Sequence, residues 1–326
     1  MPDDASSRAL AAHWNNFPYA NISRHWHAFW LRFTPAGDVK QAFHAERVFE
    51  KLHDEPGCSM RVAYHYPDER GTVDTGPPCG PWRITKALHN AADGLQHPSQ
   101  TVMTTLLLPG GPSAWCSKIS ALGTAPCAAE LFLHHSEHLR MSAGVVHAAD
   151  GALQQLSLIR ETSLGPWPSS DWSTDTHAIP TDAAGARERL EQDGAPLDAS
   201  GRGVAISARL EQRPLTNVPF ESTRLAKATT DDVLLLCPDR VAIVAPRQRV
   251  AGAGFSCATA WWPAGDTSVL YTIEAHWDGG GALAEVRHLC FTLEAATHWR
   301  RGTVAVLVAA TAAAAALWLS RYAVRR

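Results

Sequence analysis

Short segments with bulky side chains at alternate positions recur along most of this chain, and this pattern constrains the fold more than any other feature of the sequence. The segments extend from residue 26 to about 161 and resume from 203 to 293. Period-2 alternation between turn-forming residues is typical of half-buried β-strands. Many short strands at this spacing predict antiparallel barrels or sandwiches.

Two such series divide the chain. The first predicts strands at 26–33, 39–49, 61–66, 101–108, 129–134, 139–147 and 152–160. The second predicts strands at 203–210, 233–237, 240–245, 255–262, 269–277 and 282–293. Residues 164–200 are rich in Pro, Ser, Asp, Gly and Ala, which predicts a linker with a short helix. We therefore expect an N-terminal tail (1–12), a first barrel (13–163), the linker (164–200), a second barrel (201–296) and a C-terminal anchor (297–326).

The C-terminal anchor contains an uncharged stretch of 19 residues, 302–320. As a helix it rises about 28 Å, close to the hydrocarbon thickness of a bilayer. The alternative is an Ala-rich helix docked on the body, but such a helix normally carries a polar face, and this one has none. We expect a single transmembrane helix of the tail-anchored type. Its membrane-anchoring residues include Thr303, Val306, Leu307, Leu317 and Trp318.

Composition and charge exclude several classes of protein. Hydrophobic residues make up 45% of the 326 residues and charged residues 19%, which is typical of globular chains. The formal net charge of −3 provides no basic field for nucleic acid. The seven cysteines match no zinc framework and are expected to be reduced and mostly buried. The sixteen histidines are scattered, so no metal site is predicted.

Motifs of common enzymes are absent from the sequence. It contains no G-x-S-x-G, no H-E-x-x-H and no phosphate-binding glycine loop. No catalytic residue is therefore predicted.

The segment that begins at Trp26 resembles the opening of a calycin-type barrel. Trp26, Trp30 and Gly37 match the opening of a family of cyanobacterial and algal proteins built from two lipocalin-like barrels. Ala28 stands where that family usually has glycine. The family is similar in fold to the S-type and T-type phycobiliprotein lyases, and the resemblance spans most of residues 13–294.

Three further segments carry the resemblance. Residues 130–133 and 139–142 resemble paired strands that place a Glu and an Arg inside the barrel. Residues 156–161 resemble the strand that closes the first barrel, and residues 234–241 resemble a hairpin in which Arg240 replaces a glycine. The resemblance implies an all-β fold with two lipocalin-like antiparallel barrels in tandem, followed here by the predicted transmembrane helix.

The resemblance also implies that the first barrel holds a hydrophobic ligand, such as a bilin or another tetrapyrrole. Arg140 would bind a carboxylate through its planar guanidinium, and Glu130 would accept hydrogen bonds from pyrrole N–H groups. Trp26 and Trp30 lie four residues apart on one face of a strand and would stack on a flat ring. Arg160 completes the predicted ligand-binding set. The alternatives are a purely structural Glu–Arg pair and tryptophans that plug the barrel.

Two functions follow from these alternatives. The first is a membrane-anchored binding protein at a plastid membrane, with a chromophore acceptor or a membrane complex as a further partner. Its enzymatic variant is lyase-like attachment of a bilin. The second is a membrane-tethered assembly scaffold with barrels that are filled by side chains. A cavity of several hundred Å³ in the first barrel favours the first function, and a packed core favours the second.

Overall fold

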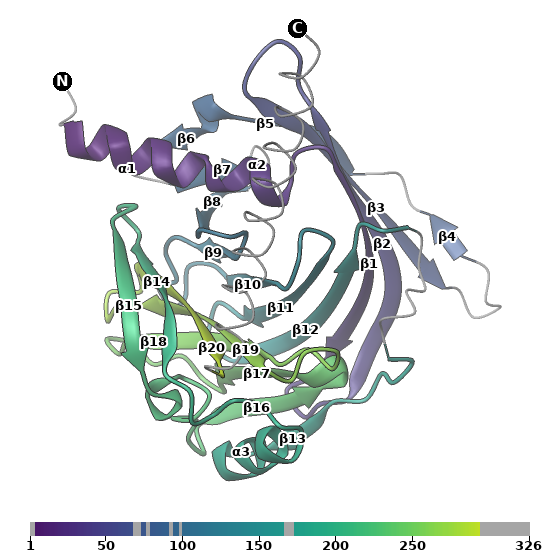
Figure 1. Cartoon of the computed structure of the whole chain (residues 1–326), viewed down its shortest axis with the longest axis vertical. Helices are drawn as coiled ribbons and strands as arrows, with labels where there is room; N and C mark the ends of the chain where they lie inside the picture. The colour runs from purple at the N-terminus through teal and green to yellow at the C-terminus, as the bar shows by residue number, and fades with distance from the viewer. Residues whose placement is uncertain are drawn as a thin grey trace, which may run out of the picture.

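The computed structural model describes residues 4–67, 73–75, 79–90, 94–97, 100–165 and 173–293, and in them β-structure dominates (Figure 1). The first of two antiparallel sheets has 12 strands. They are β1 (Arg24–Phe33), β2 (Val39–Lys51), β3 (Gly57–Pro67), β4 (Val73–Thr75), β5 (Cys79–Thr85), β6 (His89–Asn90), β7 (Gly94–His97), β8 (Gln100–Leu107), β9 (Ser113–Ser117), β10 (Cys127–His134), β11 (Leu139–His147) and β12 (Leu153–Thr162).

The second sheet has eight strands. They are β13 (Ile179–Thr181), β14 (Gly201–Ser207), β15 (Gln212–Val218), β16 (Asp232–Cys237), β17 (Val241–Pro246), β18 (Phe255–Trp261), β19 (Val269–Trp277) and β20 (Leu283–Thr292). Two short 3-10 helices, η2 (Phe220–Ser222) and η3 (Pro238–Arg240), lie between strands of this unit.

The first sheet curls into a nearly closed barrel. Its strand order is β4-β3-β2-β1-β12-β11-β10-β9-β8-β7-β6, and β5 also pairs with β3. The short helix η1 (Lys86–Leu88) joins β5 directly to β6, so the chain itself connects the two ends of the sheet. Helix α1 (Asp4–Trp14) contacts β6 and β8, and α2 (Asn16–Ala20) continues across the same end of the barrel (Figure 1).

The two sheets pack face to face, and their contact forms the main hydrophobic core. Leu31 and Leu131 from the outer face of the first sheet join Ile243 and Ile273 of the second sheet in this core. Because side chains alternate along a strand, the neighbour of Leu131, Phe132, points to the opposite face and into the barrel. The interior of the first barrel is therefore separate from the main core.

The other face of the second sheet is filled. Helix α3 (Ala183–Gln192) packs on it through Ala186 and Leu190, which lie one helical turn apart. The carboxylate of Asp182 caps this helix by accepting a hydrogen bond of 2.7 Å from the backbone N–H of Gly185. Strand β13 pairs with β16. The predicted linker therefore supplies a strand and a core helix to the second unit, which is an eight-stranded sheet with a packed interior.

Alternation in the sequence located the strands well. Each predicted strand is present, with its ends displaced by a few residues. Seven strands were not predicted: β4, β5, β6, β7, β9, β13 and β15. They have at most seven residues, and β5, β13 and β15 contain proline, which interrupts the strand pattern. The seven cysteines all lie among the described residues and form no disulfide there, and five of them are buried.

The predicted membrane span at 302–320 lies outside the described residues, and so do Thr303, Val306, Leu307, Leu317 and Trp318. Within the part of the chain that the structure describes, no helix combines the length and apolar character needed to cross a bilayer.

Candidate functional site

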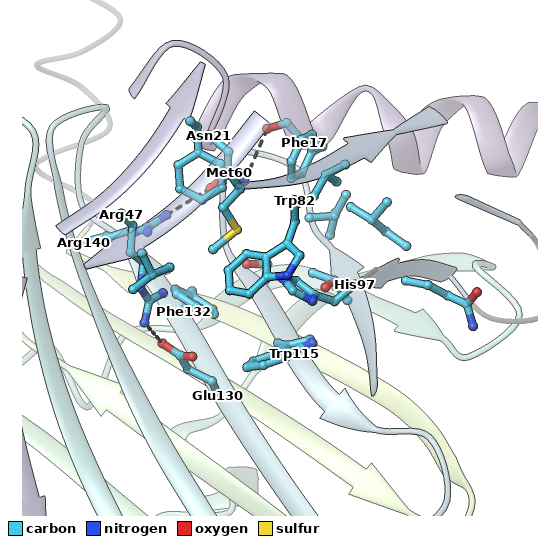
Figure 2. A pocket seen from close by; sticks show the side chains of 18 of the residues that line it. Phe17, Asn21, Arg47, Met60, Trp82, His97, Trp115, Glu130, Phe132 and Arg140 are labelled. Carbon is cyan, nitrogen blue, oxygen red and sulfur yellow. Dashed lines mark hydrogen bonds and ion pairs between the residues drawn. The ribbon is translucent and has the colours of Figure 1, made fainter. Parts of the chain in front are cut away.

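A cavity lies inside the first barrel, at the end that α2 covers, and seven of the 20 residues that line it are Phe, Tyr or Trp (Figure 2). The cavity volume is about 170 Å³. A comparable apolar cavity of about 150 Å³ binds one benzene ring, whereas sites that enclose a drug-sized ligand measure about 300–1,000 Å³. The space therefore fits one aromatic ring. The aromatic wall consists of Phe17, Trp30, Phe49, Tyr64, Trp82, Trp115 and Phe132.

A buried ion pair forms one side of the cavity. Arg47 of β2 donates a hydrogen bond of 2.7 Å to the Glu130 carboxylate of β10. The hydroxyl of Ser142, on β11, donates to the same carboxylate oxygen at 3.0 Å. Arg47 and Glu130 are 6% and 7% exposed, so this pair is almost fully removed from water. The cavity thus combines an aromatic wall with a charged but paired side.

A second pair lies beside the first. Arg140 of β11 binds the Glu161 carboxylate of β12 through two nitrogens, at 2.6 and 3.1 Å. Arg140 also donates to the side-chain oxygen of Asn21, just after α2, at 3.2 Å. Arg47 lies 3.5 Å from Glu161 and connects the two pairs. Two guanidinium groups and two carboxylates therefore form one quartet with no net charge.

The quartet stabilises its own charges. Burial raises the pKa of the Glu161 carboxyl, but Arg140 and Arg47 lower it more, so its pKa lies below the ordinary value. Burial opposes the charge of Arg47, but Glu130 and Glu161 outweigh it and raise its pKa. Burial lowers the pKa of Arg140, and Glu161 offsets part of that effect. A ligand carboxylate would have to compete with these existing partners.

Aromatic rings cover both guanidinium groups. The Arg140 guanidinium carbon lies 4.1 Å from the ring centre of Trp26, and that of Arg47 lies 5.2 Å from Trp30. Phe132 lies within 5.5 Å of both arginines. Such cation–π contacts favour the charged form of the arginines and fix the orientation of the rings.

Two tryptophans of the cavity wall carry unused hydrogen-bond donors. The indole N–H groups of Trp30 and Trp115 are buried and have no acceptor among the described residues. Buried donors normally have a partner.

Of the residues that were predicted to bind ligand, some line the cavity and others do not. Glu130, Arg140 and Trp30 line the cavity. Trp26 is fully buried in a hydrophobic cluster behind the cavity wall, where the structural alternative had placed it. Arg160, which was also predicted to bind the ligand, does not line the cavity.

Arg160 points out of the barrel. It is fully buried and binds Asp239 of the second unit at 2.5 Å and the backbone oxygen of Ser173 at 2.8 Å. Its neighbour Glu161 points inward instead. A shift of one residue along a strand exchanges the two faces.

The sequence analysis did not identify four residues of the cavity and the quartet: Arg47, Glu161, Trp82 and Trp115. Arg47 is detectable in principle, since Phe43, Ala45 and Phe49 alternate with it on β2 and all are buried. Trp82 and Trp115 lie on the unpredicted strands β5 and β9, so the sequence did not show which face of the sheet each side chain occupies.

The N-terminal helices are tied to this end of the barrel through a buried pair of histidines. His13 of α1 accepts a hydrogen bond of 2.7 Å from the backbone N–H of Leu107, and its other ring nitrogen lies 2.5 Å from His89. Burial, with the nearby His89 adding to it, lowers the pKa of His13 to about 3, and burial lowers that of His89 to about 4. Both rings are therefore neutral near pH 7, which this contact requires.

The nearly closed barrel and its lined cavity define a calycin-type β-barrel protein. Residues 11–165 match the family model described as "Domain of unknown function (DUF3598), N-terminal". This match confirms the family resemblance that was inferred from the sequence.

Two solved structures are similar to the chain. A DUF3598-family protein of unknown function from Nostoc punctiforme PCC 73102 aligns at 13% identity with a TM-score of 0.52, over 86% of this chain and 99% of that chain. The alignment shows a shared fold. The S-type phycobiliprotein lyase CPES from Guillardia theta aligns at 11% identity with a TM-score of 0.31, over 50% of this chain and 99% of that chain. A comparison with curated proteins finds no match.

Proposed function

We propose that the first barrel binds a hydrophobic ligand and that one aromatic ring of this ligand enters the cavity. The observation that carries the proposal is the wall formed by Trp30, Trp82 and Trp115, in which two buried indole N–H groups lack an acceptor among the described residues. A planar ring would stack on these side chains. A carbonyl or heteroatom on the ring would accept the indole hydrogen bond.

A bilin or another tetrapyrrole is the first ligand class to test, because the family resemblance inferred from the sequence suggests it. A complete tetrapyrrole is larger than a cavity of about 170 Å³. One terminal ring would therefore enter, and the other rings would remain at the mouth. Since Arg47 and Arg140 already have carboxylate partners, we expect ring stacking to contribute more to affinity than recognition of a propionate.

Binding is tested by titrating the full chain, in detergent, with biliverdin while its tryptophan fluorescence and the ligand absorbance are recorded. Thr105 lines the cavity from β8, and Thr105→Phe would fill the space for the ring. Thr216→Phe makes the same substitution at an exposed position on β15 and serves as the matched control. We expect Thr105→Phe to weaken binding at least tenfold and Thr216→Phe to leave it unchanged. Equal binding by both variants, with folding verified by circular dichroism, would contradict the proposal.

A scaffold without ligand is the second candidate, and the self-satisfied quartet together with the packed second unit favours it. In that case neither biliverdin nor haem would change the fluorescence or the melting temperature of the protein. Arg140→Met would then lower stability without affecting any binding.

Membrane attachment and the partners also remain predictions. The uncharged segment 302–320 supports a single C-terminal anchor at a membrane, with a plastid membrane as the expected place. Such an anchor would bring a bound chromophore close to an acceptor protein or a membrane complex. Lyase-like transfer of a bilin to an acceptor thiol is the enzymatic variant of this proposal.

A further inference from the structure

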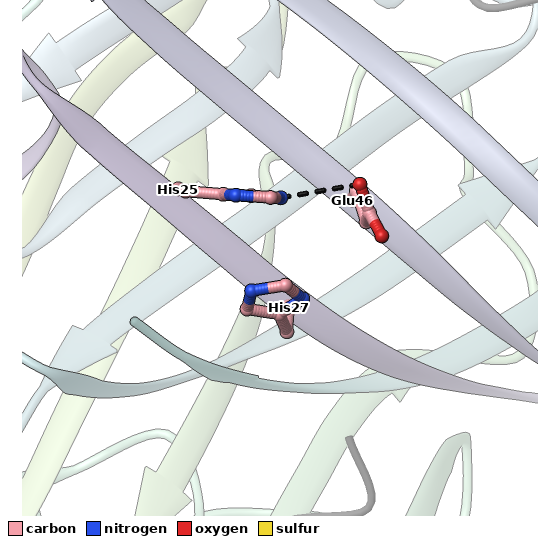
Figure 3. A group of neighbouring side chains, drawn as sticks. All are labelled: His25, His27 and Glu46. Carbon is pink, nitrogen blue, oxygen red and sulfur yellow. Dashed lines mark hydrogen bonds and ion pairs between the residues drawn. The ribbon is translucent and has the colours of Figure 1, made fainter. Parts of the chain in front are cut away.

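Two histidines and a glutamate converge on the outer face of the first barrel (Figure 3). His25 and His27 lie two residues apart on β1 and therefore project from the same face. Glu46 lies directly opposite His27 on β2. One nitrogen of each histidine and one carboxylate oxygen all lie within 4.8 Å of one another. The strand pairing thus fixes the backbone positions of three donors.

The separations are close to those of a metal site. The His25 ring nitrogen Nε2 lies 3.1 Å from Oε2 of Glu46. In a tetrahedral zinc site, with bonds of about 2.0–2.2 Å, neighbouring donor atoms are roughly 3.3–3.5 Å apart. One pair of donors is therefore already near the required separation. A change in the side-chain torsion angles of His27 that moves its ring nitrogen by about 1–2 Å would bring all three donor atoms to this separation.

A third histidine lies near the carboxylate. His65 of β3 places Nε2 at 3.8 Å from Oε1 of Glu46, the carboxylate oxygen that does not contact His25. Metal-binding side chains commonly have a second partner of this kind, which orients them. A small movement would allow His65 to bind the second oxygen of Glu46 while the first oxygen faces the metal.

Solvent reaches two of the donors. The side chains of His25 and Glu46 are 46% and 30% exposed, so an ion can approach them from solvent. Neutral imidazole and ionised carboxylate are the forms that bind metals.

We propose that His25, His27 and Glu46 form a binding site for a divalent metal ion of the zinc class. Two imidazoles and a carboxylate select Zn²⁺, Co²⁺, Ni²⁺ or Cu²⁺ over Ca²⁺ and Mg²⁺, which prefer sets of oxygen ligands. Three protein ligands leave at least one coordination position open to solvent, as in catalytic zinc sites. The competing explanation is an ordinary surface hydrogen bond between His25 and Glu46.

The test uses the untagged full chain, free of metal, titrated with Co²⁺ and then with Zn²⁺. We expect one equivalent of Co²⁺ to produce visible absorption typical of four- or five-coordinate cobalt, and Zn²⁺ to displace it. His27→Ala and Glu46→Gln should each weaken binding at least tenfold. Both positions lie on the outer face, so circular dichroism should show an unchanged fold.

The matched control is His177→Ala. His177 is an exposed histidine that lies 3.0 Å from a carboxylate oxygen of Asp175, so it reproduces the His–carboxylate pair without the second histidine. Its substitution should leave Co²⁺ binding unchanged. The proposal is overturned if Co²⁺ produces no such absorption at equimolar concentration. It is equally overturned if His27→Ala binds as tightly as the unmodified chain.

Discussion

Removing one charge from the buried quartet should destabilise the protein strongly. Glu161 is fully buried and binds Arg140 through two hydrogen bonds, while Arg47 lies 3.5 Å away. Glu161→Gln preserves the shape of the side chain and removes its charge, which leaves Arg140 without a compensating carboxylate. Breaking a buried ion pair in this way costs about 3–5 kcal/mol. Domains are typically stable by only about 5–15 kcal/mol, so this is a large fraction of the total.

The assay is urea unfolding followed by tryptophan fluorescence. For a loss of about 3–5 kcal/mol and a denaturant dependence near 3 kcal/mol per molar urea, the midpoint should fall by about 1–2 M. Glu50→Gln is the matched control, because Glu50 lies on β2 in an exposed pair, 3.6 Å from Arg61. Exposed pairs contribute about 0–1 kcal/mol, so this variant should unfold almost as the unmodified protein does.

A double substitution tests the cause. Arg140→Met combined with Glu161→Leu removes both charges and keeps apolar volume, and Arg47 retains its own partner Glu130. Replacement of a buried pair by well-packed apolar residues is often neutral or stabilising. The double variant should therefore recover most of the stability that Glu161→Gln loses. A loss below about 1 kcal/mol in Glu161→Gln, or a double variant less stable than the single one, would refute this reasoning.

Three further predictions follow from the structure. Acid should loosen the N-terminal helices: the folded-state pKa values of His13 and His89, about 3 and about 4, lie below the unfolded value near 6.5. The contribution of the two histidines to the free energy of unfolding is complete above pH 6.5 and falls by about 1.4 kcal/mol per pH unit for each histidine as the pH drops toward 4. Urea unfolding at pH 7 and pH 4.5 should show this loss of stability. The variant His13→Gln should lose less stability between the two pH values. Asp239→Asn should cost about 2–4 kcal/mol, because it leaves Arg160 buried without a carboxylate; Asn tolerates the positive φ of 57° at this position, so an unchanged melting temperature would exclude a stabilising role for the pair. In liposome flotation the full chain should rise with the vesicles, and a chain that ends at residue 299 should not; flotation of both would remove the case for a span at 302–320.

The local pattern of the sequence was sufficient to predict much of the secondary structure and part of the cavity lining. Alternation of bulky side chains identified the strands, and it placed Glu130 and Arg140 on neighbouring strands, where both line the cavity. Because a short turn joins β10 to β11, the residues that pair between these two strands are close in sequence. The aromatic opening around Trp26 and Trp30, together with three further segments, indicated the family resemblance. These features depend on residues close in sequence, and a single sequence records them directly.

Only the tertiary structure decided which charges meet. Arg47 and Glu130 are 83 residues apart, and Arg140 lies opposite Glu161 because β11 pairs with β12. A period of two shows which residues share a face, but it does not show which face points inward, so the sequence did not reveal that Glu161, and not Arg160, faces the interior of the barrel. The same applies to His25, His27 and Glu46. Their convergence depends on the register between β1 and β2, which packing of both faces of the sheet fixes.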